Sequence, residues 1–277
     1  MQQRPLGWLV MAGLVGLGLA GGVFYWRHPP QSSPSAVPTA PPLTLKGAAV
    51  EGSLLSAADG QGHSFNLKLE TAEVDPKNGA GEVYLYTVLY QPTPHLPWQN
   101  LCAPDAEGVA KALPLTGQWD AKGNYTPQGI TLACTNGALA KCVRWGYKPW
   151  KTDQDIPWRD LHQACTRMVR ADYCGDGVSH TQQGVNIDIY DDFGIQRRTP
   201  QSGMVFEAAW GPQGAVAIHR TRIPASMAQV RQQCPDRLKP LSPAVERDLT
   251  LQNLQGYGSG ALIFNDSFIK PKIGSSP

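Results

Sequence analysis

The sequence has no surplus of charge of either sign. Its 277 residues contain 24 Lys and Arg against 22 Asp and Glu, so the formal net charge at pH 7 is only +2. Nucleic-acid binding depends on a clustered basic surface that neutralises phosphates. The near balance of charge argues against that class of function, and we expect no nucleic-acid partner.

Short metal-binding motifs are also missing. The six cysteines and six histidines form no Cys-x-x-Cys pair and no His-x-x-x-His pair, the kind of spacing that structural zinc sites use. Asp176, Asp188, Asp191 and Asp192 could offer oxygen ligands to calcium, but their spacing matches no EF-hand loop. We therefore expect no metal and no cofactor.

Charge is absent from residues 6–26, LGWLVMAGLVGLGLAGGVFYW. A helix of this length spans about 31 Å at ~1.5 Å per residue, which matches a hydrocarbon core of about 30 Å. Trp8 and Trp26 lie near the two ends, where indole rings favour the membrane interface. The pattern predicts a transmembrane signal-anchor helix in contact with the lipid bilayer, with residues 1–5 in the cytoplasm.

A cleaved signal peptide is the alternative for this segment. Gly18 and Ala20 are small residues that could precede a cleavage site. The apolar stretch is longer than a usual signal-peptide core, and no Ala-x-Ala motif follows it. We favour the uncleaved anchor.

Residues 27–44 are rich in proline and serine. Six prolines fall among the fourteen residues 29–42, PPQSSPSAVPTAPP. Such a composition favours extended, polyproline-like conformations and does not build a core. We interpret this segment as a stalk between the membrane and a folded domain.

All the cysteines follow the predicted stalk. An even number of cysteines behind an export or anchor signal indicates an oxidising compartment and disulfide bonds. Six cysteines allow fifteen pairings, and their spacing does not select one. The predicted disulfide cysteines are Cys102, Cys134, Cys142, Cys165, Cys174 and Cys234.

The rest of the chain predicts an α+β fold that is rich in strands. The 29 glycines and 24 prolines suit short strands and turns. Alternation of apolar and polar residues predicts strands, and one amphipathic helix is expected over residues 156–173, with apolar residues at three- and four-residue spacing. A second, short helix is expected at 226–234. The predicted strands are 63–70, 82–91, 115–120, 126–134, 185–191, 204–210 and 215–220.

We expect these elements to form one mostly antiparallel domain over residues 45–235, stabilised by disulfides and built around one main helix. Residues 236–277 show only a sparse apolar pattern, and we expect them to form a C-terminal tail that wraps the domain.

Four segments resemble the ADYC domain family. They read KCVRWGYKPW (141–150), HQACTRMVRADYCGDGVSHTQQG (162–184), IDIYDDFG (187–194) and FEAAWGPQGAVAIHR (206–220), and they contain the motif Ala171-Asp172-Tyr173-Cys174. The similarity covers about residues 48–225. It implies an exported bacterial domain and brings no established activity. Ala217 stands where we expect some relatives to carry another cysteine, which leaves the partner of Cys234 open.

Cys174 is the first candidate site residue. A cysteine hydrolase would pair it with His180 as the base and Asp172 as the residue that orients the base. However, catalytic cysteines usually lie at the N-terminus of a helix, where the helix dipole lowers the thiol pKa, and Cys174 follows its helix. We therefore favour a disulfide at Cys174.

Two further candidate sites involve cations and aromatic rings. Arg167 and Arg170 are three residues apart on the predicted helix, so they could bind an anionic ligand or pair with Asp172 in a structural network. Trp145 and Trp150 could stack on a sugar ring, although tryptophan is more often a core residue. We favour the structural role for both pairs.

Together these features predict a single-pass protein of the bacterial inner membrane with its C-terminal domain in the periplasm or outside the cell. We favour a binding or structural module for an envelope glycan, peptide or protein. The alternative is a cysteine-dependent hydrolase that acts on envelope polymers or peptides.

Overall fold

The computed structural model describes residues 9–10, 48–59, 64–78, 80–93, 95–120, 122–153, 155–243, 245, 251–257 and 259–268. The predicted transmembrane helix and stalk lie outside these residues, except for Leu9–Val10. These two residues form a short strand, β1, instead of the predicted helix, and β1 pairs with β2. No helix within the described ranges is both long enough and apolar enough to cross a membrane.

The first sheet contains the N-terminal strands and is antiparallel throughout. Its strand order is β1-β2-β3-β4-β6-β7, and β5 pairs with β4 beside β6. The predicted alternation in 63–70 is confirmed, because Leu67 and Leu69 are fully buried. The other strands are β2 (Leu54–Asp59), β3 (Ser64–Val74), β4 (Tyr84–Gln91), β5 (Gln99–Asn100), β6 (Ala112–Trp119) and β7 (Tyr125–Cys134).

The second sheet combines strands that are far apart in the sequence. Its order is β10-β9-β11-β8, again antiparallel. Strand β11, the last in the chain, therefore lies in the interior of the sheet between β9 and β8. The four strands are β8 (Ile187–Asp191), β9 (Met204–Gly211), β10 (Gly214–Ile218) and β11 (Ile263–Phe268).

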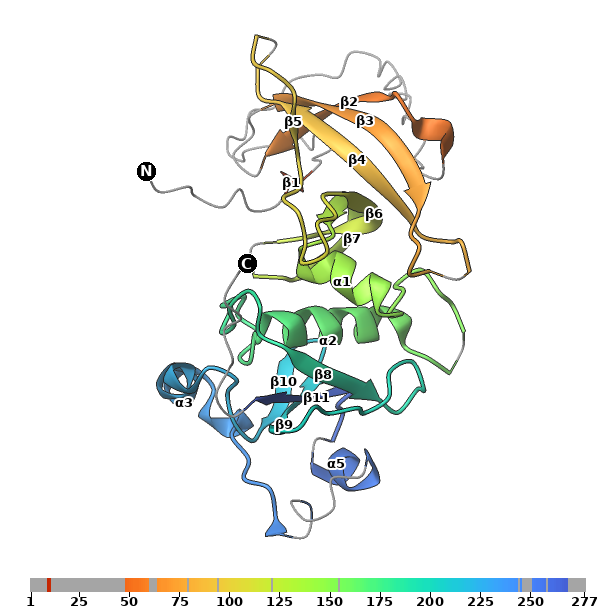
Figure 1. Ribbon diagram of the computed structural model, residues 1–277. Helices are drawn as coiled ribbons and strands as arrows, with labels where there is room; N and C mark the ends of the chain where they lie inside the picture. Colours follow the sequence, from red (N-terminus) through yellow and green to blue (C-terminus); the bar gives the residue numbers. More distant parts are fainter. Residues whose placement is uncertain are drawn as a thin grey trace, which may run out of the picture.

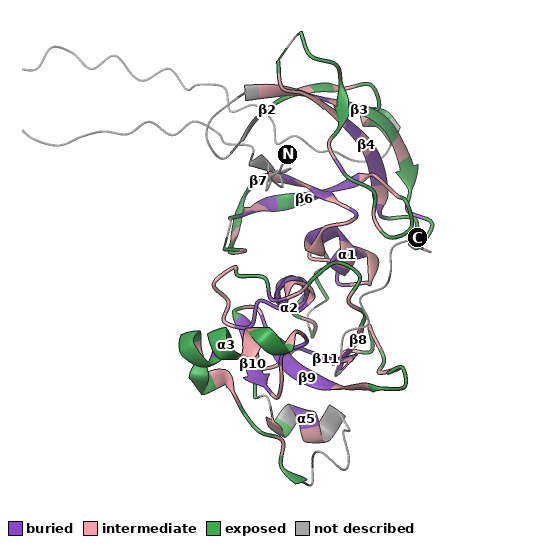
Figure 2. Ribbon diagram, turned by 60° about the vertical axis from the view of Figure 1, so that its left-hand side comes forward, coloured by how far each residue is buried: buried purple, intermediate pink, exposed green. Residues whose placement is uncertain are grey.

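Helices form a middle layer between the two sheets (Figure 1). Helix α1 (Ala138–Arg144) packs on the first sheet, and α2 (Trp158–Arg170) packs on the second. On the far face of the second sheet lies α5 (Leu251–Tyr257), and α3 (Met227–Gln233) lies at its side (Figure 1). Figure 2 shows buried residues concentrated along α2 and β9, where these layers meet.

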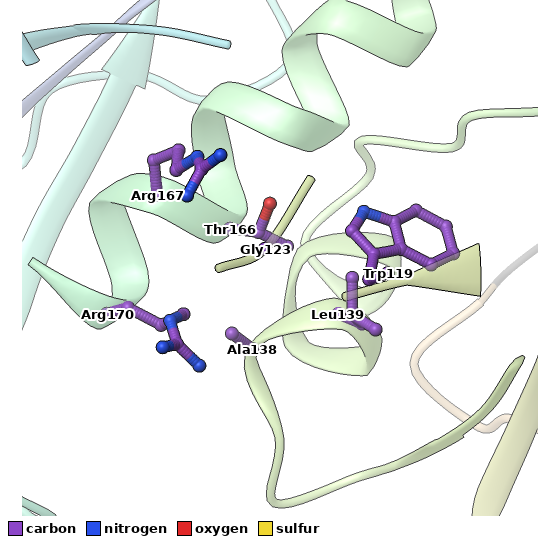
Figure 3. Close-up of a pocket in the computed structure, with 7 residues that line it drawn as sticks. All are labelled: Trp119, Gly123, Ala138, Leu139, Thr166, Arg167 and Arg170. Carbon is purple, nitrogen blue, oxygen red and sulfur yellow. The ribbon is translucent and has the colours of Figure 1, made fainter. Parts of the chain in front are cut away.

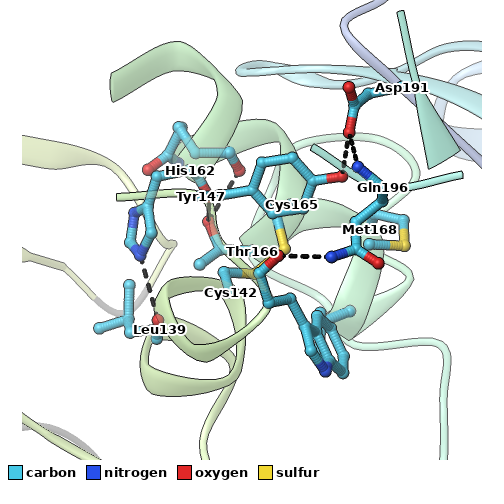
Figure 4. The surroundings of a disulfide bond; sticks show 12 residues. Leu139, Cys142, Tyr147, His162, Cys165, Thr166, Met168, Asp191 and Gln196 are labelled. Carbon is cyan, nitrogen blue, oxygen red and sulfur yellow. Dashed lines mark hydrogen bonds between the residues drawn. A yellow bond between two sulfur atoms is a disulfide. The ribbon is translucent and has the colours of Figure 1, made fainter. Parts of the chain in front are cut away.

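Helix α2 is amphipathic as predicted. Leu161, Ala164, Cys165 and Met168 are fully buried and belong to the largest core cluster, which joins α2 to the second sheet. Cys165 also forms a disulfide with Cys142 of α1, so the two helices of the middle layer are covalently linked (Figure 4).

The β-rich, antiparallel character of the fold is confirmed, as is the short second helix. Several elements were not predicted, among them α1, α5, β5 and β11. Helix α1 has only seven residues, too few for its periodicity to be read from the sequence. The prediction of 236–277 as a wrapping tail is wrong for β11. Its residues 263–267 are at most 1% exposed, and the domain therefore extends beyond residue 235.

Removal of β11 tests how far the second sheet depends on it. A chain that ends at residue 258 should lose hydrogen-exchange protection in β8, since β11 is the only described strand that pairs with β8. A chain that ends at residue 270 retains β11 and is the matched control. Protected β8 amides in the shorter chain would contradict the prediction.

Buried His162 on α2 generates a prediction about pH. The residue is 1% exposed, and its Nε2–H donates to the Leu139 carbonyl over 3.1 Å (Figure 4). Burial lowers the pKa of His162 to about 4, from about 6.5 in an unfolded chain. Between these values only the unfolded state binds the proton, so acid destabilises the fold.

We expect the free energy of unfolding to fall by about 3 kcal/mol from pH 6.5 to pH 4 because of this residue. Urea titrations across this range should show a shallower slope of stability against pH for His162→Gln. The control is His95→Gln, since His95 is an exposed residue of the β4–β5 loop. An unchanged slope for His162→Gln would refute the assignment.

Candidate functional site

The ADYC motif begins where α2 ends. The helix was predicted to continue to residue 173, but it ends at Arg170 because Ala171 adopts the left-handed conformation, with φ at 50°. The Ala171 N–H donates to the Met168 carbonyl and the Asp172 N–H donates to the Arg167 carbonyl, which forms a Schellman motif. Glycine usually occupies this position. Here the methyl group of Ala171 is fully buried in the core instead.

Asp172 and Arg167 form a buried ion pair. The Asp172 carboxylate accepts from the Arg167 guanidinium and from the Gly177 N–H, and both charged side chains are at most 2% exposed. The other guanidinium N–H groups of Arg167 donate to the carbonyls of Lys122 and Pro212 and to the Asn124 amide oxygen. The pair thus connects the end of α2 with the turns of both sheets.

Arg170 points differently from Arg167. Its guanidinium donates to the Gly177 carbonyl. Both arginines line a small cavity with Thr166, Ala138 and the ring of Trp119 (Figure 3). The cavity has a volume of ≈ 10 Å³, which is the size of one water molecule. The two arginines therefore line a cavity that holds about one water molecule, and the Arg167 charge is already paired with Asp172.

Tyr173 reaches into the second sheet. Its hydroxyl donates to Glu207 Oε1 over 2.9 Å and accepts the backbone N–H of Arg222, also over 2.9 Å. Its ring stacks on Trp210 with centroids 5.2 Å apart. Burial, together with the adjacent Glu207 carboxylate, raises the pKa of Tyr173 well above its ordinary value, so the hydroxyl remains protonated.

The Glu207 carboxylate is the centre of this network. Arg222 donates to it through Nε and Nη2, at 2.9–3.2 Å, and the Ser267 hydroxyl donates to the second oxygen. Burial by itself disfavours the Arg222 cation, but the Glu207 charge outweighs burial and raises its pKa. Sequence analysis missed this pair. The only signal was an acidic residue inside the apolar strand MVFEAAW.

Cys174 is bonded to Cys234, at the end of α3. A bridged cysteine has no thiolate, so the structure contradicts the alternative in which Cys174 is a nucleophile. The predicted disulfide state is confirmed for all six cysteines, and the described residues contain no free thiol. The pairs, which the sequence left open, are Cys102–Cys134, Cys142–Cys165 and Cys174–Cys234.

The motif residues 171–174 and the turn that follows them, up to Gly177, form a corner at the end of α2. His180 lies against this corner, and it forms no catalytic dyad with the bridged Cys174. It is 5% exposed, and its ring centroid lies 5.7 Å from that of Tyr173. Burial lowers the pKa of His180, although the charges of Asp176 and Asp172 oppose the shift. Its backbone N–H donates to the Arg170 carbonyl, which folds the loop after the motif back onto the helix end.

Gly175 permits the closest backbone contact of the corner. A Cβ atom at this position would lie 2.0 Å from the Gln213 carbonyl oxygen, in the β9–β10 turn. Gly214, in the same turn, faces the backbone of Tyr173 in a similar way. The chain after Cys174 and the β9–β10 turn are therefore packed backbone to backbone.

The other predicted site residues are dispersed. Trp145 is partly buried against the main core, whereas Trp150 is 43% exposed in the loop before α2. Asp188 accepts from Thr199, and Asp191 accepts from the Tyr147 hydroxyl. Within the described ranges, no group of three His, Cys, Asp or Glu side chains is arranged to hold a metal ion.

Substitution of Arg222 tests the buried network. Arg222→Met leaves the Glu207 carboxylate buried without its cation, and we expect a loss of about 3–5 kcal/mol in the free energy of unfolding. Tyr173→Phe removes two hydrogen bonds and should cost about 1–3 kcal/mol. Urea unfolding of the oxidised protein measures both. Arg197→Met, at an exposed arginine, is the control, and equal losses at Arg197 and Arg222 would refute the assignment.

Comparison with known proteins supports the resemblance seen in the sequence. The family model described as ADYC domain matches residues 47–224, which is more than half of the chain. No curated protein and no solved structure matches the chain significantly. The matched region ends before Cys234 and before β11, although both belong to the folded unit described above.

Proposed function

Because the chain belongs to the ADYC domain family, and because its motif builds a closed structural corner, we propose that it is a binding or scaffolding module of the bacterial cell envelope. In this proposal residues 6–26 anchor the chain in the inner membrane. The folded domain then lies in the periplasm or outside the cell, where it binds an envelope glycan, peptide or protein.

The observation that carries this proposal is the use of every cysteine in a disulfide bond. Disulfides persist in oxidising compartments and are rare in the reducing cytosol. The three bridges join segments that are 23 to 60 residues apart in the sequence. A domain that depends on such links requires export before it is stable.

The charged side chains around the motif are paired with groups inside the protein, and this supports a binding role over a catalytic one. The charged residues of the motif region, Arg167, Asp172 and the Glu207–Arg222 pair, are bound to one another or to backbone groups. Cys174 has no thiolate to offer. The corner therefore has the chemistry of a scaffold that positions other surfaces.

The membrane anchor has a defined structural consequence. Leu9 and Val10 pair with β2 through backbone hydrogen bonds, and the same residues cannot also form part of a helix in the bilayer. Anchoring therefore requires β1 to leave the edge of β2. The remaining strands of the first sheet retain their own partners without β1.

Fractionation of bacteria that express the full chain tests the proposal. We expect the intact chain in the carbonate-washed membrane pellet, digestible by protease added to spheroplasts, and without maleimide-reactive cysteines before reduction. Leu14→Arg combined with Leu17→Arg should release the chain from the pellet, since each charge in the span costs about 2.5–3.5 kcal/mol.

Two outcomes contradict separate parts of the proposal. Cysteines that react with maleimide in unreduced cells would exclude the oxidising compartment. A soluble wild-type chain that has lost its first 20–30 residues would exclude the anchor and support signal-peptide cleavage.

A further inference from the structure

A solvent-open hollow lies beside α3, away from the closed corner of the motif. It has a volume of ≈ 290 Å³ and lies between the end of β10, the first turns of α3 and the chain that follows residue 237. Such a volume is near the lower limit for small-ligand pockets, so it accommodates about one side chain and its attached polar group. The lining residues are Ile218, His219, Met227, Arg231, Leu238, Lys239 and Pro240.

The floor of the hollow is apolar and fixed in position. Ile218 is 1% exposed, and it forms a parallel bridge with Leu238. The Lys239 N–H donates to the Ile218 carbonyl over 2.9 Å, so this segment is held against the edge of the second sheet. Met227 contributes a flexible side chain from α3.

The rim of the hollow is cationic. Arg231 and Lys239 are both exposed, and among the described residues neither has a carboxylate within ion-pair distance. Residues 219–239 contain five Arg and Lys residues against one acidic residue, Asp236. Arg222 is paired with the buried acid Glu207, which leaves four of these cationic residues against Asp236.

We propose that this hollow binds a carboxylate carried on a short apolar group, such as the free C-terminus of a peptide that ends in an aliphatic residue. The carboxylate lies between Arg231 and Lys239, where it relieves the repulsion of two like charges. The aliphatic group covers Ile218, Leu238 and Met227. The volume accommodates one terminal unit of such a ligand.

This inference gives a ligand class to the binding role proposed above and does not depend on the membrane anchor. The fractionation experiment and the ligand-binding experiment therefore test separate claims, and either claim can fail without the other. A chain that is not anchored can still bind the carboxylate, and an anchored chain that does not bind it would overturn only the inference.

Titration of the oxidised full chain with N-acetyl-leucine tests the site. Methyl NMR should show a saturable shift of the Met227 signal, assigned by its loss in Met227→Leu. We expect N-acetyl-leucinamide, which lacks the charge, and acetate, which lacks the aliphatic group, to bind at least tenfold more weakly. Capric acid distinguishes a fatty acid from a peptide terminus, and tighter binding of capric acid would overturn the peptide assignment.

Substitutions of the rim residues complete the experiment. Arg231→Gln and Lys239→Gln should each weaken N-acetyl-leucine binding at least fivefold, and Arg231→Glu should abolish it. Arg197→Gln removes an exposed positive charge elsewhere and should have no effect. Equal weakening by Arg197→Gln, equal binding of the amide, or saturation by inorganic phosphate alone would overturn the proposal. Unchanged melting temperatures establish that the variants are folded.

Discussion

The second sheet and the segments packed on it depend on the hydrogen bonds of one buried carboxylate, that of Glu207. It lies on β9 and receives hydrogen bonds from Tyr173 after α2, from Arg222 after β10 and from Ser267 on β11. A buried charge is costly unless it is paired and fully hydrogen-bonded. The one carboxylate therefore requires four segments of the chain to be in place together, and it makes their arrangement specific.

A buried ion-pair network also lies between α1 and the first sheet. Arg144 of α1 donates to Asp75 and Asp105 over 2.9 and 3.1 Å, and all three side chains are at most 8% exposed. Arg167 connects the two networks, because it donates to Asp172 after α2 and to the backbone of the β6–β7 turn in the first sheet. Internal arginines thus hold the layers in register, while Arg231 and Lys239 leave their charge on the surface.

Elements with a clear period could be predicted from the sequence. The spacing of Leu161, Cys165 and Met168 identified α2, and alternation identified most strands. Strand β11 could not be predicted, because its buried residues include Asn265 and Asp266, which a pattern of apolar residues does not detect. They are buried because Trp210 and Tyr190 supply matching donors, and such partners become visible only in three dimensions.

The candidate site could likewise be predicted only in part from the sequence. The motif located the corner in the sequence, and the even number of cysteines predicted that Cys174 is in a disulfide. The spacing of the cysteines could not identify Cys234 as its partner. The closed environment of Arg167 depends on the turns at Lys122 and Pro212, about 45 residues away in each direction. Contacts at that separation leave no local trace in the sequence.

The position of β11 has a consequence for the order of folding. It follows all other described strands in the sequence yet pairs with β8, about 75 residues upstream, and with β9. Vectorial synthesis delivers this strand after its neighbours, so the second sheet stays open until then. Contacts between distant segments form slowly, because loop closure precedes their stabilisation. The second sheet is consequently completed only after the last of its strands in the sequence has emerged.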